Sequence, residues 1–162
     1  MNKQRIAIIT DSGTDTDEDF RKEHDIRIMP LRIIYSDGST FSSGVDISSE
    51  EVVRRFGEEI PTTSLPSPHE MREVLGQARN DGYTKAVIVT IASALSATNQ
   101  TAHMVADEME DFPVLVVDSR SIGIAAGMVV RRAVEYVEAG CPSRNSRSAW
   151  SRASRGPTSS LP

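Results

Sequence analysis

Apolar and polar positions along the chain predict short buried strands that alternate with amphipathic helices. Three apolar runs, at residues 6–9, 87–91 and 114–117, are short and rich in β-branched residues, which is typical of strands buried on both faces. Small polar residues and then a predicted helix follow each run. Strands that alternate with helices in this way form right-handed crossovers. The pattern therefore predicts an α/β fold, with a mostly parallel sheet flanked by helices in a single domain.

Two stretches that contain proline interrupt this pattern. Residues 26–35 have β character, but Pro30 lacks the N–H that a central strand would donate, which indicates an edge strand or a bulge. Residues 60–68 contain three prolines and are predicted to form a rigid polar loop rather than a long regular element. Ser67 and Glu70 have the spacing of a capping box, so a helix is predicted to begin directly after Ser67.

The composition predicts a cytoplasmic protein with one ordinary core. The chain has 162 residues, of which 38% are hydrophobic. The single cysteine excludes an internal disulfide, and the N-terminal sequence lacks the apolar stretch of a signal peptide. No run approaches the roughly 20 apolar residues of a membrane span.

The distribution of charge separates the last 22 residues from the rest of the chain. The formal net charge is −5, and residues 141–162 carry four arginines and no acidic residue, so subtracting these four charges leaves −9 for residues 1–140. An acidic body argues against nucleic-acid binding, which depends on basic side chains that neutralise phosphates. Residues 141–162 are rich in serine and proline and lack an apolar period, which predicts disorder. We therefore expect a folded domain over residues 1–140 and a separate tail.

Polar loops at the ends of the predicted strands form the candidate functional site. Hydroxyl-bearing side chains occur at residues 10–12, 62–64, 93–98 and 118–119. In an open α/β sheet, the loops that follow the strands lie along one edge, where ligands bind. Any one hydroxyl is simply explained as a helix cap. Their convergence on one edge predicts an anion site, with Ser93 at the point where a strand gives way to a helix N-terminus.

The residue types at this edge favour binding over catalysis. The sequence contains no glycine-rich phosphate loop, no nucleophile elbow and no paired histidine or cysteine at metal-ligand spacing. Hydroxyl and backbone N–H groups can hold a carboxylate, so we expect a binding protein without catalytic residues, bound metal or cofactor. An alternative stays open, because the acid–hydroxyl pairs at residues 11–12 and 118–119 would suit a phosphoryl-transfer enzyme that uses a divalent metal.

The order of several motifs resembles the N-terminal domain of the DegV family. The motifs are TDS at residues 10–12, TSLPS at 63–67, IASALSAT at 91–98 and DSRSIGIAAG at 118–127. The resemblance covers residues 5–140. DegV proteins are two-domain bacterial proteins that bind one long-chain fatty acid between their domains, and some present its carboxylate to a fatty acid kinase. The resemblance thus implies a carrier rather than an enzyme, with a fatty acid as its ligand and a fatty acid kinase as a partner.

The same resemblance assigns site residues. The family's carboxylate-binding hydroxyls fall on Thr63 and Ser93. Further hydroxyls of the same two motifs are expected to support them, namely Ser64, Ser96 and Thr98. Nearby apolar residues are expected to contact the acyl chain, namely Ile91, Leu95 and Ile122.

The chain also departs from the family pattern. Family members usually have Gln at the position of Leu65 and Gly at that of Ala97, so affinity or ligand choice is expected to differ. After Gly140 the family continues into a second domain, whereas residues 141–162 resemble an out-of-frame translation. Our hypothesis is a truncated or frameshifted member, with a remnant that binds no ligand as a further alternative. The uncovered apolar face is then predicted to mediate self-association.

Overall fold

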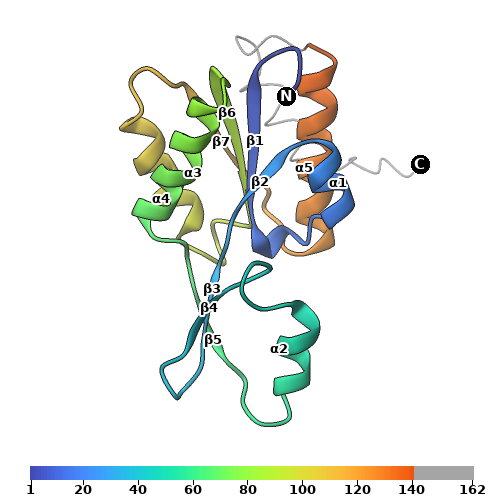
Figure 1. Cartoon of the computed structure of the whole chain (residues 1–162), viewed down its shortest axis with the longest axis vertical. Coiled ribbons are helices and arrows are strands. Elements are labelled where there is room, and N and C mark those ends of the chain that lie inside the picture. The colour runs from blue at the N-terminus through green and yellow to red at the C-terminus, as the bar shows by residue number, and fades with distance from the viewer. Residues whose placement is uncertain (141–162) are drawn as a thin grey trace, which may run out of the picture.

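The structure is a computed structural model that describes residues 1–140 of the chain (Figure 1). The predictions for residues 141–162 lie outside this range. Within it, no helix is long and apolar enough to cross a membrane. The elements follow one another in the order β1 (Ile6–Asp11), η1 (Ser12–Thr14), α1 (Glu18–Glu23), β2 (Ile26–Met29), β3 (Arg32–Ile34), β4 (Thr40–Ser42), α2 (Ser49–Arg55), β5 (Thr62–Ser64), α3 (Pro68–Asn80), β6 (Lys85–Thr90), α4 (Thr98–Asp107), β7 (Val114–Asp118) and α5 (Ile124–Glu138).

The larger sheet has the strand order β2-β1-β6-β7, and every neighbouring pair of strands is parallel. All six residues of β1 are buried, and Ile8 of this strand lies opposite Val87 of β6. The strands β1, β6 and β7 coincide with the three apolar runs of the sequence. The predicted α/β fold, with a mostly parallel sheet flanked by helices, is therefore confirmed.

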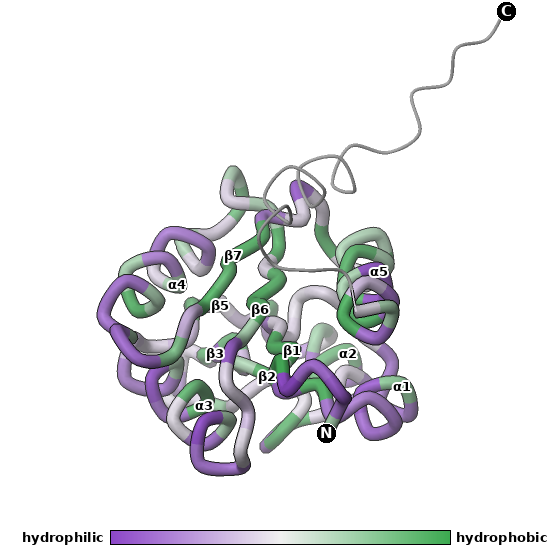
Figure 2. The backbone as a smooth tube through the Cα atoms, turned by 90° about the horizontal axis from the view of Figure 1, so that it is seen from above, coloured by the Kyte–Doolittle hydropathy of each residue, from purple (hydrophilic) through white to green (hydrophobic). Residues whose placement is uncertain are grey.

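Side chains of β1 alternate between two cores on opposite faces of the sheet. Ala7 and Ile9 belong to the core on the side of α3 and α4, whereas Ile6 and Ile8 belong to the core on the side of α5. Figure 1 shows α3 and α4 on one side of the sheet and α1 and α5 on the other. Figure 2 shows the hydrophobic central strands between these helix layers. The sheet is thus covered on both faces, as its apolar strands require.

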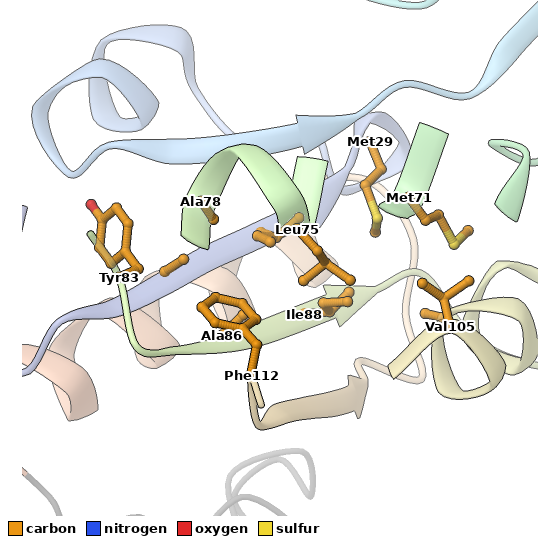
Figure 3. Packing of buried hydrophobic residues seen from close by; sticks show 12 residues of the cluster. Met29, Met71, Leu75, Ala78, Tyr83, Ala86, Ile88, Val105 and Phe112 are labelled. Atoms are coloured by element: carbon orange, nitrogen blue, oxygen red, sulfur yellow. The ribbon is translucent and has the colours of Figure 1, made fainter. Parts of the chain in front are cut away.

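The core under α3 fixes this helix against the sheet (Figure 3). Leu75 of α3, Ile88 of β6 and Phe112 are at most 1% exposed. Burying a large apolar side chain stabilises the fold by about 1.5–3 kcal/mol relative to leaving it in water. The helix begins where the sequence predicts, because Ser67 Oγ accepts from Glu70 N and the Glu70 carboxylate accepts from Ser67 N. The predicted capping box is confirmed.

A second, antiparallel sheet with the strand order β4-β3-β5 lies beyond the carboxyl ends of the larger sheet, together with α2 (Figure 1). Pro30 stands between β2 and β3, and β2 is an edge strand of the larger sheet, as predicted. The prediction of a loop over residues 60–68 was wrong at Thr62–Ser64, which form β5 and pair with β3. The prolines lie outside these three residues, so they do not remove an N–H from the short strand.

Candidate functional site

The loops that follow β1, β6 and β7 meet at the carboxyl edge of the larger sheet, on the side where the small sheet lies (Figure 1). Ala92 N donates a hydrogen bond to Ser121 O at 2.8 Å, which joins the loops after β6 and β7. Gly123 N donates to Gly13 O at 2.9 Å, which joins the loops after β7 and β1. These backbone contacts bring three of the four predicted polar loops together.

Asp118, at the end of β7, holds Ser93 through two hydrogen bonds. Ser93 Oγ donates to Asp118 Oδ2 at 2.6 Å, and Ser93 N donates to Asp118 Oδ1 at 3.1 Å. Asp118 Oδ1 also accepts from Arg120 N at 2.9 Å. One carboxylate therefore fixes both the backbone and the hydroxyl of Ser93, while Ser93 itself stays exposed.

Asp118 is held in its charged form. Partial burial of its carboxylate works to raise its pKa, but the hydrogen bonds from the Ser93 hydroxyl and from the backbone of Arg120 and Ser93, with the nearby Arg120 charge, lower it below the usual value. Since an ionised carboxylate only accepts hydrogen bonds, the proton of the Ser93 hydroxyl points to Asp118.

Asp11, at the end of β1, provides a second carboxylate that links loops at this edge. Its Oδ2 accepts from Ile91 N at 2.8 Å and its Oδ1 accepts from Gly13 N at 2.9 Å. Burial raises the pKa of Asp11 to about 6, although the two backbone hydrogen bonds act in the opposite direction. The carboxylate thereby ties the first residue after β6 to the loop after β1.

The helix after Ser93 begins later than the sequence suggested. α4 starts at Thr98, and the side chain of its N-cap residue, Ala97, makes no capping hydrogen bond. Placing Ser93 directly at a helix N-terminus was therefore wrong, because a turn separates it from the helix. Within this turn, Ser96 Oγ and Thr98 Oγ1 share a hydrogen bond of 2.8 Å. Thr98 is fully buried, so these two hydroxyls stabilise the start of α4.

Thr63 lies in the middle of β5, opposite Ile33 of β3. Its side chain is exposed and, among residues 1–140, it makes no side-chain hydrogen bond. Its neighbour Ser64 is half-buried. No hydrogen bond within the described range joins Thr63 or Ser64 to Ser93, so the structure leaves the Thr63 hydroxyl free while it fixes the Ser93 hydroxyl.

The three apolar residues assigned to the acyl chain differ in exposure. Ile91 is only 5% exposed, whereas Leu95 is 63% and Ile122 is 58% exposed. Leu95 and Ile122 lie on the two loops that the Ala92–Ser121 hydrogen bond joins. Ile124 and Met128 of α5 are also exposed, and sequence reasoning missed both. Their spacing of four residues, opposite the buried positions of α5, is the signal that would have revealed them.

Gly127 allows α5 to approach the loop after β1. A Cβ at this position would stand only 2.7 Å from the carbonyl oxygen of Thr14, which is closer than packed atoms come. Gly123 adopts a φ of 61° and lies just before the helix. These two glycines bring the exposed residues at the start of α5 to the same edge as Ser93.

The hypothesis of metal-dependent phosphoryl transfer relied on Asp11 and Asp118. Both carboxylates accept backbone N–H hydrogen bonds, and Asp11 is fully buried. In the part of the chain that the structure describes, no three His, Cys, Asp or Glu side chains lie together as a metal site. Through the hydrogen bonds that they accept from the backbone, the two aspartates organise these loops.

Related proteins match the chain along most of its length. A family model described as "Uncharacterised protein, DegV family" matches residues 5–154. A DegV domain-containing protein of Clostridium acetobutylicum is 37% identical over 134 residues, which are 83% of this chain and 47% of the relative. One from Clostridium perfringens is 39% identical over 137 residues, or 85% of this chain and 48% of the relative. The chain thus spans about half the length of these relatives.

Solved structures show the same fold. A fatty-acid-binding DegV family protein from Thermus thermophilus has a TM-score of 0.82 and 31% identity, over 93% of this chain and 54% of its own. A Thermotoga maritima protein described as revealing a fatty-acid-binding function has a TM-score of 0.81 and 26% identity, over 91% of this chain and 54% of its own. The family match, the curated relatives and the shared fold together show that this chain belongs to the DegV family.

Proposed function

We propose that this chain binds a long-chain fatty acid, with the carboxyl group held between the hydroxyls of Thr63 and Ser93. The observation that carries the proposal is the exposed Ser93 hydroxyl, which Asp118 holds beside a surface with the exposed residues Leu95 and Ile122. A fatty acid needs this combination, because its head forms hydrogen bonds and its tail is apolar. The fatty-acid-binding DegV proteins of Thermus thermophilus and Thermotoga maritima support the same ligand class.

The head group requires hydrogen-bonding groups that are not already used within the protein. Thr63 meets this condition, since its exposed hydroxyl makes no side-chain hydrogen bond among residues 1–140. Ser93 is exposed and keeps its oxygen lone pairs, although its proton is directed to Asp118. We propose that Ser64 lines the site beside Thr63, whereas Ser96 and Thr98 support it indirectly by stabilising the turn after Ser93.

The acyl chain requires apolar surface near this head-group site. Leu95 and Ile122 supply it on adjoining loops, and Ile124 and Met128 extend it along α5. Each methylene removed from water contributes about 0.8 kcal/mol, so the acyl tail supplies most of the favourable free energy of binding. Ile91 is buried, and we propose that it supports this apolar surface from below and does not contact the ligand directly.

We propose a carrier role rather than an enzymatic one. The site uses hydroxyls and apolar side chains and needs neither cofactor nor metal, because the fatty acid itself is the ligand. A carboxyl group held at the exposed edge of the sheet is accessible to a second protein. Presentation of the acyl carboxyl group to a fatty acid kinase is therefore part of the proposal.

A titration of the 162-residue chain with dodecanoic acid tests this function. Thr63→Ala and Ser93→Ala are each expected to weaken binding about three- to tenfold, because each removes a hydrogen bond to the head group. Ser49→Ala, on the exposed first turn of α2, removes a hydroxyl elsewhere and should leave the affinity unchanged. Equal affinities for all four proteins would place the ligand at another site.

A further inference from the structure

We propose that Asp118 makes the Ser93 hydroxyl a hydrogen-bond acceptor toward the ligand, so that the site takes up the undissociated fatty acid rather than its carboxylate. This inference rests on the proposed function, since it concerns the same head-group site. It assigns Asp118 the part of a positioning residue, which acts on the ligand through Ser93.

The hydroxyl of Ser93 carries a single proton. A serine hydroxyl donates one hydrogen bond and accepts others. Here the proton goes to Asp118 Oδ2 over 2.6 Å, a short distance that is typical of a bond to a charged acceptor. What Ser93 Oγ offers to an incoming molecule is therefore its lone pairs.

The surroundings of Asp118 keep this arrangement in place. Asp118 Oδ1 accepts from the backbone N–H groups of Ser93 and Arg120, so the carboxylate receives three hydrogen bonds and gives none. The charge of Arg120, on the turn after β7, also favours ionised Asp118. The carboxylate of Asp11 accepts from the backbone N–H groups of Ile91 and Gly13 rather than from the Ser93 hydroxyl, so it does not compete for the Ser93 proton.

A carboxylic acid matches this site better than a carboxylate does. The undissociated acid has one O–H donor, which suits Ser93 Oγ, and one carbonyl acceptor, which suits the free hydroxyl of Thr63. A carboxylate has acceptors only, so it would place oxygen against the lone pairs of Ser93 and a second negative charge near Asp118. The fixed polarity of Ser93 thus selects the protonated form.

Proton uptake upon binding provides the test. Calorimetric titration of the 162-residue chain with dodecanoic acid, at pH 8 in two buffers of different ionisation enthalpy, should show about one proton taken up per acid bound. The affinity should fall about tenfold per pH unit between pH 7.5 and 9, a range above the pKa of Asp11. The uncharged probe dodecanamide should bind with an affinity that does not change over this range.

The Asp118→Asn variant reverses the direction of the hydrogen bond between the side chains at positions 93 and 118. Its amide NH₂ can donate to Ser93 Oγ, which frees the serine proton to donate to a carboxylate. Proton uptake by this variant should drop to near zero, and its affinity should become independent of pH. Asp111→Asn removes one exposed charge before β7, at the opposite edge of the sheet, and should behave as the unaltered chain.

NMR spectroscopy of dodecanoic acid labelled with carbon-13 at the carboxyl group shows whether the bound ligand is protonated. The bound ligand's NMR signal should remain at the position of the protonated acid at pH 8. A signal at the carboxylate position, or binding without proton uptake, would overturn the inference and leave fatty-acid binding intact. Failure of both dodecanoic acid and dodecanamide to bind would overturn the proposed function and this inference with it. Because the unaltered chain alone gives these readouts, the inference is decided even if the Asn variant fails to fold.

Discussion

Asp11 and Ile91 are joined by a hydrogen bond of 2.8 Å from the backbone N–H of Ile91 to the buried carboxylate of Asp11. The bond connects the ends of β1 and β6, and the chain reaches Ser93 only two residues later. The hydrogen bond to the buried Asp11 carboxylate therefore bears directly on the geometry of the proposed site.

The pH dependence of stability should report on Asp11. Burial raises its pKa from 3.8 to about 6, so between these values the folded protein binds more protons than the unfolded chain does. The Asp11 contribution to the free energy of unfolding is then fully present below about pH 4 and falls by about 3 kcal/mol as the pH rises past 6. Chemical denaturation across this range should show that the Asp11→Asn variant lacks this decrease.

The control for this experiment is Asp111→Asn, which removes an exposed carboxylate. Its stability profile should run parallel to that of the unaltered chain. Parallel profiles for Asp11→Asn and the unaltered chain would instead show that Asp11 titrates in the same way in the folded and unfolded states.

Close packing at Gly127 should make this position intolerant of a larger residue. In Gly127→Ala the new Cβ would meet the Thr14 carbonyl oxygen at 2.7 Å, and the resulting shift is expected to lower the free energy of unfolding by about 1–3 kcal/mol. Gly76→Ala is the matched control in α3, because nothing lies within 4 Å of its Cβ position. The free energy of unfolding of this control should rise by about 0.5–1 kcal/mol, because alanine has a better helix propensity than glycine. Similar thermal unfolding of both variants would contradict the close approach.

The exposed apolar residues at the carboxyl edge should promote self-association. Leu95, Ile122, Ile124 and Met128 are all exposed, on the two joined loops and at the start of α5, and exposed apolar patches are typical of interaction sites. Light scattering of the 162-residue chain without ligand should show species larger than a monomer as the concentration rises. Ile122→Ser should reduce this association, whereas Val45→Ser, at an exposed position in the small-sheet region, should not. A monomer at every concentration that also binds no apolar dye would contradict this prediction.

Much of the fold could be predicted because the relevant signals are local. The apolar runs of β1, β6 and β7 and the capping box at Ser67 each lie within a short stretch of sequence. The strand β5 was missed because its three residues depend on pairing with β3, a contact between residues about thirty positions apart that no local pattern encodes.

The candidate site was harder to predict for the same reason. Motif order pointed to Thr63 and Ser93, but only the sheet topology shows that Asp118, 25 residues after Ser93, directs the serine proton. The helix period also failed to reveal the turn between Ser93 and α4, because small polar residues fit a turn and a helix start equally well. Whether Ser93 donates or accepts a hydrogen bond depends on its neighbours in the folded protein, so the sequence of the motif alone cannot show it.

Native mass spectrometry of the gently purified chain, with extraction of the bound lipid, tests directly whether the chain binds a fatty acid. We expect one long-chain fatty acid per chain, with reduced occupancy in Ser93→Ala and unchanged occupancy in Ser49→Ala. A chain that carries no fatty acid and takes up none when dodecanoic acid is added would contradict it.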